Sequence, residues 1–458
     1  MNFNDDTICA IASSLTPSGI GIIRISGNNS TNIASNIFVD KNKKSISLNS
    51  SHKIKYGYIY DKEKNLFIDE VIVLTFLAPH SYTAEDVVEI QCHGGPVVLK
   101  EILSLVERNG ARIAEPGEFT KRAYLNGRID LSKAEAVADI ISAKNTYARQ
   151  ASFAELKGNL SDKINDIRKK ILEDIAFIEA CLDDPEHMSL TGFKETLENQ
   201  IENFLNDLNK IIKNYDNGKI IKEGINTVIL GKPNVGKSSL LNLLLNEDRA
   251  IVTDIAGTTR DIIKESINLN GITLNIIDTA GIRNENKIDE VEKIGIDRAK
   301  KEATNADLII LILDNSTPFD ENDYNLIDFC KTLNKKTITL LNKSDIANLN
   351  SLNNYFIPFS TKTKLGLSKL TEKIEELFIN GDIDFNSEIF ISNERQLSTI
   401  KKAKAALENV LNGIQNDISE DFLTIDLNDA YIYLSQVLGV EVTDDVIDEI
   451  FSKFCMGK

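Results

Sequence analysis

Residues 231–238 read GKPNVGKS, and this stretch decides the fold of the central part of the chain because it fits the phosphate-loop pattern G-x-x-x-x-G-K-[ST]. The apolar run TVIL at 227–230 precedes it, and SLLNLL at 239–244 follows it. This strand–loop–helix order is the context that the motif requires. Nucleotide phosphates then lie on backbone N–H groups at a helix N-terminus, which predicts a nucleotide ligand.

Two later motifs predict a guanine nucleotide with Mg²⁺. DTAG at 278–281 ends an apolar strand, so that the Asp278 carboxylate acts on Mg²⁺ through water and the Gly281 N–H meets the γ-phosphate. NKSD at 342–345 selects guanine, because a carboxylate at Asp345 accepts from the ring N1–H and 2-amino group, which adenine does not offer. STK at 360–362 stands in the usual place of the loop that contacts the guanine oxygen.

The switch regions predict an unusual route to hydrolysis. Ile282 stands where many GTPases carry the glutamine that orients the attacking water, and an alkyl side chain cannot do this. The catalytic group must therefore come from elsewhere, and the acids of DEVE at 289–292 are either part of a switch or a solvated helix face. The side-chain oxygen of Asn234, with carbonyls near Thr253 and Ile255, suits a monovalent cation in the place of an arginine finger.

The predicted site residues follow from these loops. Lys237 reaches the β- and γ-phosphates, and Ser238 and Thr259 are the predicted Mg²⁺ ligands. The complete predicted GTP-binding set is Asn234, Val235, Gly236, Lys237, Ser238, Ser239, Thr253, Asp254, Ile255, Ala256, Gly257, Thr258, Thr259, Asp278, Thr279, Ala280, Gly281, Asn342, Lys343, Ser344, Asp345, Ser360, Thr361 and Lys362.

Composition is ordinary for a soluble globular protein with several domains. The chain has 458 residues, of which 42% are hydrophobic and 26% charged, and roughly two to four domains are expected. Apolar runs are too short for a membrane span and the N-terminus lacks a signal sequence, so we expect a cytoplasmic protein without membrane contact. Its 5 scattered cysteines predict neither disulfides nor structural zinc. The net charge of −17 argues against a protein that grips nucleic acid alone, although a local basic patch stays open.

The pattern along the chain predicts a multidomain α/β and all-α architecture. Residues 5 to about 120 alternate strands and turns with one clear helix at 97–108, an α+β domain. Helical periodicity follows to about residue 214, βαβ alternation begins near Asn217-Gly218, and a helical segment closes the chain. Because insertion at a loop tip is tolerated, we predict a discontinuous helical-bundle domain with a Ras-like phosphate-loop GTPase domain inserted into it. The predicted boundaries are 1–119, 120–217, 218–382 and 383–458.

Several further stretches resemble one family of GTPases. GTTRD at 257–261 and DTAGIR at 278–283 resemble the branch that includes Era and EngA. The flanking regions narrow the resemblance to the MnmE (TrmE) family of tRNA-modification GTPases, over essentially the full length. The similar stretches are GIGIIRISG at 19–27, SYTAED at 81–86, PGEFTKRA at 116–123, LNGR at 125–128 and the terminal CMGK at 455–458.

The resemblance implies a function in tRNA modification. Members of the family act with a flavin- and NADH-using partner, MnmG, to install an aminomethyl-type (carboxymethylaminomethyl) group on C5 of the wobble uridine, U34, of certain tRNAs. The one-carbon unit comes from a 5-formyl- or methylene-tetrahydrofolate bound by the N-terminal domain, which also forms the homodimer. Hydrolysis of GTP, with Mg²⁺, is stimulated by K⁺ when two nucleotide domains pair.

The resemblance also implies roles for individual residues. Arg24, Glu85, Arg128 and Lys458 match folate-contacting positions; Arg128 replaces the usual Lys, and Ala84 replaces a common Gly. The K⁺-site positions are Asn234, Thr253, Ile255 and Thr258. Glu292 matches the water-orienting glutamate, and Cys455 belongs to the terminal motif with its role left open.

Two alternatives stay open at this stage. A GTPase switch for ribosome assembly, like Era or EngA, shares the nucleotide motifs; the single phosphate loop and helical C-terminus of this chain disfavour it. Cys92-His93 invites a metal or nucleophile interpretation, but we expect this pair to be structural. The sequence identifies neither the tRNAs modified nor the path from nucleotide state to the folate site.

Overall fold

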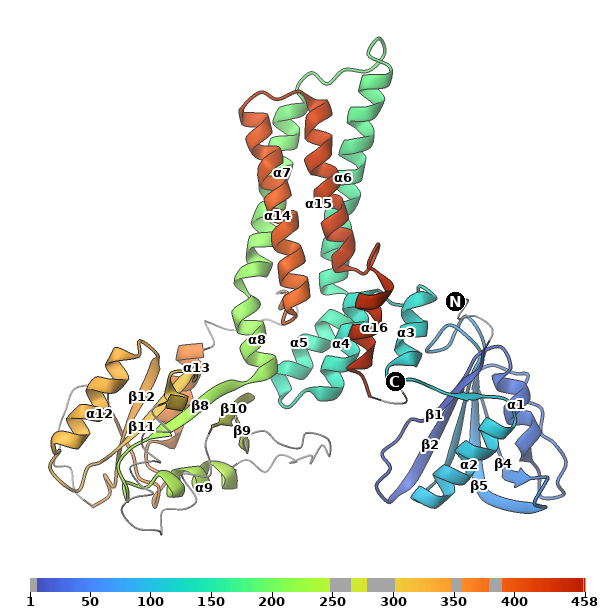
Figure 1. Ribbon diagram of the computed structural model, residues 1–458, viewed down its shortest axis with the longest axis horizontal. Helices are drawn as coiled ribbons and strands as arrows, with labels where there is room; N and C mark the ends of the chain where they lie inside the picture. Colours follow the sequence, from blue (N-terminus) through green and yellow to red (C-terminus); the bar gives the residue numbers. More distant parts are fainter. Residues whose placement is uncertain are drawn as a thin grey trace. The chain divides into compact units, whose positions relative to one another are not determined.

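The structure is a computed structural model that describes residues 6–247, 265–277, 301–346, 356–378, 389–455 and 457. Its chain divides into two compact units, each drawn from segments far apart in the sequence (Figure 1). The first unit comprises 1–138, 155–197 and 405–458, and the second comprises 139–154 and 198–404. The predicted domain boundaries at 119, 217 and 382 come from changes in the sequence pattern, not from contacts, and they stay a prediction.

The first unit begins with a mixed sheet covered by helices. The strand order is β3-β4-β5-β6-β2-β1-β7, antiparallel except for the parallel β1–β7 pair. Ile23, Ile25, Val73 and Ile90 alternate inward from their strands and pack on Leu99 and Ile102 of α2. The bounds are β1 Ile8–Ile11, β2 Ser18–Ser26, α1 Ser30–Ile37, β3 Phe38–Val39, β4 Lys53–Asp61, β5 Leu66–Phe76, β6 Val87–Gly94, α2 Pro96–Arg108 and β7 Arg112–Ile113.

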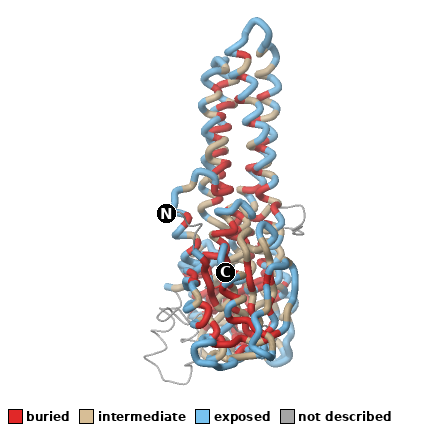
Figure 2. The backbone as a smooth tube through the Cα atoms, turned by 90° about the vertical axis from the view of Figure 1, so that its right-hand side faces the viewer, coloured by how far each residue is buried: buried red, intermediate tan, exposed pale blue. Residues whose placement is uncertain are grey.

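Helices make up the rest of this unit. On α6, Ile164, Ile167 and Ile171 are buried at helical spacing, and this helix packs along α15. Figure 2 shows buried positions alternating with exposed ones along the long helices. Among the described helices, none combines the length and apolar content that a membrane span requires. The bounds are α3 Glu118–Leu125, α4 Leu131–Ser142, α5 Thr146–Lys157, α6 Asn159–Asp183, α7 Phe193–Lys213, α14 Glu394–Gln415, α15 Glu420–Val437 and α16 Asp444–Ser452; α4, α5, α7 and α14 continue from one unit into the other.

The second unit holds a predominantly parallel sheet in the order β13-β12-β11-β8-β10-β9, with β9 antiparallel to β10. The strands β8, β11 and β12 are almost wholly buried, as expected for a sheet covered on both faces. Together with the first unit, it confirms the predicted fold class. The bounds are α8 Tyr215–Glu223, β8 Ile225–Leu230, α9 Lys237–Glu247, β9 Glu265–Leu269, β10 Ile272–Ile276, β11 Leu308–Asp314, α12 Glu321–Thr332, β12 Lys336–Asn342, β13 Phe356–Pro358 and α13 Leu367–Phe378.

Two local expectations were wrong. Residues 30–37 form α1, a helix that the sequence analysis did not anticipate. The change to βαβ alternation does not occur at Asn217-Gly218, because α8 runs through both residues and β8 begins only at Ile225. Gly218 serves close packing instead of a turn: a Cβ there would lie 2.4 Å from the carbonyl oxygen of Ile391. The helix thus approaches another backbone at a distance that only glycine permits.

This contact predicts opposite outcomes for two helical glycines. Gly218→Ala forces backbone apart and should destabilise the protein by about 1–3 kcal/mol, lowering the thermal unfolding midpoint by about 2 °C or more. Gly413→Ala on α14 is the control and should be tolerated. The nearest neighbours of its Cβ would be side-chain atoms, Cδ2 of Leu423 at 2.5 Å and Cδ1 of Ile418 at 3.8 Å, and alanine favours the helix. Equal midpoints for the two variants would contradict the assignment of Gly218 to backbone packing.

Candidate functional site

The phosphate loop joins the end of β8 to the start of α9. Asn234 and Gly236 have φ of 58° and 106°, a left-handed backbone that turns successive N–H groups toward one side of the loop. The Lys237 Nζ donates to the carbonyl oxygens of Gly231 and Lys232 at 3.0 and 2.8 Å, so the cation spans the loop. The Asn234 side chain is exposed.

The base-recognition loop is tied directly to the phosphate loop. The Asn342 side chain, buried at the end of β12, donates through Nδ2 to the Val235 carbonyl at 2.7 Å and accepts from the Thr361 N–H at 3.1 Å. Gly236 is needed beside it, since a Cβ there would lie 2.3 Å from Asn342 Nδ2. One amide therefore connects three predicted GTP-binding stretches of the sequence.

The remaining residues of NKSD are positioned around this amide. Lys343 has φ of 63° and its Nζ pairs with Asp314 at 2.6 Å. Burial alone would raise the pKa of the Asp314 carboxyl, but the Lys343 ammonium and Ser316 lower it, which keeps the carboxyl ionised. The Ser344 hydroxyl donates to Leu341 O at 2.7 Å, and Asp345 is exposed. Ser360 is buried and its hydroxyl accepts from the Thr363 N–H, whereas Lys362 is exposed.

The phosphate loop has a further anchor that the sequence analysis missed. The Lys232 Nζ pairs with Asp320 at 2.8 Å and Asp323 at 2.7 Å, at the capped N-terminus of α12. Burial alone would lower the pKa of Lys232, but these hydrogen bonds raise it, so the ammonium stays charged. The spacing of 88 residues between Lys232 and Asp320 gives no local signal for this contact.

Part of the predicted set lies outside the described residues. These residues are Thr253, Asp254, Ile255, Ala256, Gly257, Thr258, Thr259, Asp278, Thr279, Ala280, Gly281, Glu292 and Lys458. Their roles stay predictions, as do the Mg²⁺ and K⁺ ligand sets to which several of them belong.

A second candidate site lies on the N-terminal sheet. A pocket of about 550 Å³ is lined by Phe76, Pro79, His80, Ser81, Tyr82, Val87, Glu89 and Arg128. The Arg128 guanidinium lies 5.0 Å from the Tyr82 ring centroid and donates to the Tyr82 carbonyl at 2.8 Å. An aromatic face, a carboxylate and a cation in one pocket suit a flat ligand with polar edges.

Arg24 connects this pocket to the chain terminus. Its guanidinium donates through Nε to Glu89 at 2.8 Å and through Nη1 to the Gly457 carbonyl at 3.0 Å, and it lies 5.5 Å from the Tyr82 ring. Gly457 packs closely on β1, because a Cβ there would lie 2.4 Å from Ile11 O. Two stretches separated by 433 residues, both predicted to serve the folate site, thus meet at Arg24.

Glu85, which the sequence predicts as a folate-contacting residue, is held by hydrogen bonds within the protein, and its role toward folate stays a prediction. Its carboxylate accepts from Ser26 Oγ at 2.7 Å and from Arg122 Nη1 at 3.2 and 3.3 Å. Arg122 is only 3% exposed and also binds Asp6 and Glu118. Glu85 is absent from the pocket lining, where Glu89 is the acidic residue. The sequence signal for Glu89 is the alternation of side chains along strand β6, which places Glu89 on the same face as Gln91.

The cysteines separate into inert and accessible groups. Cys92 is buried, its thiol donates to Gly21 O at 3.6 Å, and burial raises its pKa to about 11. His93 points away from it, exposed and paired with Asp69 at 2.7 Å. This geometry agrees with a structural role for the pair. Cys455 is exposed, and its carbonyl accepts from the Gly117 N–H at 3.3 Å.

Two protein-family models match the chain. The family described as "MnmE helical domain" matches residues 131–455, and "GTP-binding protein TrmE N-terminus" matches residues 7–128. Among solved structures, Era from Aquifex aeolicus bound to GDP and AlF₄⁻ is 27% identical and covers 40% of this chain and 66% of that chain. Its TM-score is 0.27.

Three curated relatives match over the whole length. Proteins named "tRNA modification GTPase MnmE" are 50% identical in Lachnoclostridium phytofermentans, 46% in Acetivibrio thermocellus and 44% in Clostridioides difficile. The aligned regions cover 99% of this chain and 99% of the relative in the first case, and 100% of both in the other two. With its phosphate loop, guanine loop and N-terminal domain on one chain, this protein belongs to the MnmE family of tRNA modification GTPases.

Proposed function

We propose that the chain hydrolyses GTP with Mg²⁺ and, together with a protein of the MnmG type, adds an aminomethyl-type group to C5 of the wobble uridine of certain tRNAs. A tetrahydrofolate derivative supplies the one-carbon unit. The observation that carries this proposal is the convergence of Arg24, the Tyr82 pocket and the C-terminal Gly457 in one place. Because tRNA is the substrate, the compartment that we propose is the cytoplasm.

The described residues of the pocket fit a reduced folate. A pterin is a flat ring with hydrogen-bonding edges, and Tyr82 offers a face for stacking while Glu89 accepts from amino and ring N–H groups. A folate also carries carboxylates on its glutamate, for which Arg128 is a cationic partner. Arg24 holds Glu89 in place, and the proposed contribution of Lys458 follows directly after Gly457 in the sequence. When bound, the folate supplies the one-carbon unit.

The acidic character of the chain supports a partner in tRNA binding. With a net charge of −17, the protein repels the phosphate backbone except where cations cluster. We assign most of the basic tRNA-binding surface to the MnmG-type partner. Tight, steeply salt-dependent tRNA binding by this chain alone would contradict that assignment.

An exposed apolar sheet face supports a homodimer. Ile54, Tyr56 and Ile72 are 70%, 58% and 40% exposed, and Tyr56 lies directly opposite Ile72 on the β4–β5 pair. The helices α1 and α2 pack against the other face of this sheet. A contiguous apolar surface of this kind is typical of a protein interface, here with a second copy of the chain. Sedimentation as a monomer at micromolar concentration would contradict the pairing.

For hydrolysis, we propose that K⁺ and Glu292 replace the missing arginine and glutamine. Asn234, whose exposed side chain lies in the phosphate loop, is the K⁺ ligand among the described residues. Thr253, Ile255 and Thr258 complete the proposed ion site, and K⁺ supplies positive charge beside the phosphates. The Glu292 carboxylate orients the attacking water. Pairing of two nucleotide domains completes this arrangement.

The folate proposal predicts a selective loss in one arginine variant. Arg24→Ala removes the charged donor to Glu89 and Gly457, and should weaken 5-formyltetrahydrofolate binding by about tenfold or more, measured by calorimetry. GTP hydrolysis should be unchanged. Arg108→Ala is the matched control in the same domain, since Arg108 pairs with Asp61 and Glu63. Equal folate affinity in the Arg24 and Arg108 variants would refute the site, and no binding by the parent chain would refute the folate proposal.

The hydrolysis proposal predicts dependence on one alkali ion. The steady-state GTPase rate should be about tenfold or more higher in K⁺ than in Na⁺ at matched ionic strength, because Na⁺ is too small for the same oxygen shell. Asn234→Ala should remove this difference. Glu292→Ala should slow turnover by about a hundredfold while GTP affinity changes little. Equal rates in the two salts would exclude the proposed role of Asn234, and parallel losses of rate and affinity would make Glu292 structural.

A further inference from the structure

A segment that runs from the last turn of α4 through most of α5 packs against the nucleotide-binding sheet. Residues 139–154 belong by sequence to the helical region, but they pack with the second compact unit. Asn145 stands at the centre of this segment and is only 7% exposed. Its position just before Thr146 makes it the residue that caps α5.

Every hydrogen-bonding group of the Asn145 side chain is used. Its Nδ2 donates to the Ile221 carbonyl of α8 at 3.0 Å and to the Thr273 hydroxyl of β10 at 2.9 Å. Its Oδ1 accepts from the Ala148 N–H, in the first turn of α5, at 2.7 Å. One buried amide thus joins three elements, and a buried amide loses much when any partner is removed.

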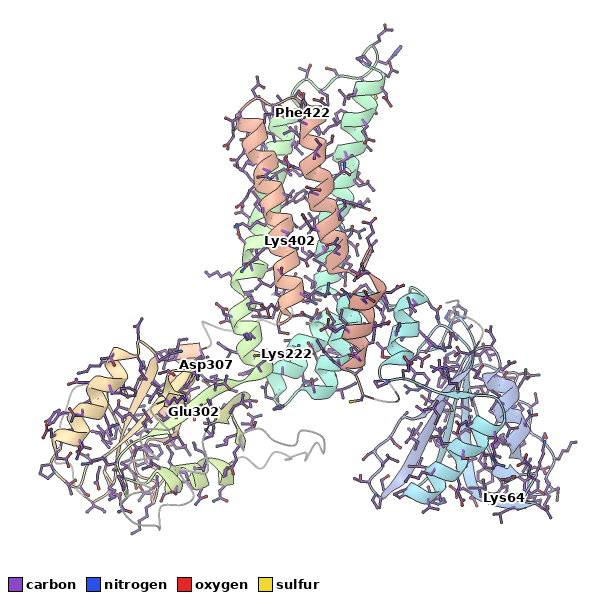
Figure 3. All side chains as sticks on the ribbon, viewed as in Figure 1. Lys64, Lys222, Glu302, Asp307, Lys402 and Phe422 are labelled. Atoms are coloured by element: carbon purple, nitrogen blue, oxygen red, sulfur yellow. The ribbon has the colours of Figure 1, made fainter. Side chains whose placement is uncertain are left out.

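Neighbouring contacts reinforce the same junction. The Lys222 ammonium of α8, labelled in Figure 3, pairs with Asp139 at 2.7 Å. The Tyr147 ring lies against Gly271 in the β9–β10 turn, where a Cβ would come within 3.0 Å of the ring. Ala148, Ile221 and Phe390 form a small buried cluster beneath these contacts. Residues 139–154 therefore contact the β9–β10 hairpin and α8 through both polar and apolar interactions.

The two elements that Asn145 binds lead into the nucleotide loops. The helix α8 runs into β8, which ends at the phosphate loop, and β10 is followed after one residue by Asp278 of DTAG. The strands β8 and β10 are parallel neighbours, with Leu274 opposite Ile225. By strand rise, Asn145 is roughly 20 Å from the phosphate loop, too far to touch the nucleotide.

We propose that Asn145 is a positioning residue that transmits the state of the nucleotide-bearing strands to α5 and so links GTP hydrolysis to tRNA modification. It attaches the start of α5 to the amino ends of the two strands whose carboxyl ends bear the phosphate-binding loops. A shift of β10 relative to β8 changes the distance between Thr273 and Ile221, and Asn145 can satisfy both only by moving with them. Coupling of this kind needs an element that responds to both sites, and this junction supplies it.

The experiment separates hydrolysis from its consequence. Full-length Asn145→Ala should hydrolyse GTP within about threefold of the parent rate but support tRNA modification at least about tenfold more slowly. Thr273→Val, which removes one acceptor and keeps the shape, should shift modification in the same direction by less. Asn275→Ala is the matched control on the same strand, because its amide bonds Glu223 O at 2.8 Å and Ser266 instead of the 139–154 segment. It should leave both activities unchanged.

A second readout does not depend on the modification partner. In the parent chain, hydrogen exchange at residues 146–154 should differ between GDP and a non-hydrolysable GTP analogue, and Asn145→Ala should abolish that difference while Asn275→Ala preserves it. A purely structural Asn145 would raise exchange equally in both nucleotide states. The proposal is overturned if the difference persists in Asn145→Ala, if the parent shows none, or if hydrolysis and modification fall together.

Discussion

The hydrogen bond from the Asn342 amide to the Val235 carbonyl is the interaction on which the nucleotide site depends. This hydrogen bond, with a donor–acceptor distance of 2.7 Å, joins the end of β12 to the phosphate loop after β8. The oxygen of the same amide accepts from the Thr361 N–H. Parallel strands bring these loops to one edge of the sheet, but only a specific contact fixes their spacing. Gly236 has no side chain at the point where this amide approaches. The phosphate-binding and base-binding loops of the site are therefore connected to each other.

The opposite edge of the same sheet carries the attachment to the helical region. Asn342 joins carboxyl ends of strands, whereas Asn145 joins α8 and β10 near the amino ends. Both residues are buried asparagines. The asparagine side chain has two N–H donors and a carbonyl acceptor, so it can bridge groups that belong to different elements. The parallel strands β8 and β10 run between them, so the proposed shift of β10 relative to β8 would reach both ends of these strands.

The sequence predicted those features that depend on local pattern. The phosphate loop, NKSD and the strand before the loop each occupy a continuous stretch whose residue types have a direct physical meaning, and the apolar run at 227–230 lies in β8 as expected. The full-length relatives confirm the family that the flanking motifs indicated. The untested ion and folate assignments remain predictions of that resemblance.

Features that depend on distant contacts were missed. The change to βαβ alternation was expected near Gly218, but this glycine lies within α8 and accommodates the approach of Ile391, more than a hundred residues later in the sequence. The contact between Arg122 and the Glu85 carboxylate was not anticipated, nor was Glu89 in the pocket lining, while the folate role of Glu85 itself stays a prediction. Asn145 carries no motif at all. In each case the partner is remote in sequence, so neither periodicity nor spacing contains it.

The Asn342-centred arrangement should form a site specific for guanine nucleotides. The most direct measurement is displacement of a fluorescent GDP analogue from the full-length chain by unlabelled GDP or ADP. We expect GDP to compete at stoichiometric levels and ADP to fail even at about hundredfold excess, because a carboxylate at Asp345 finds no donors on adenine. Comparable displacement by ADP would contradict the account.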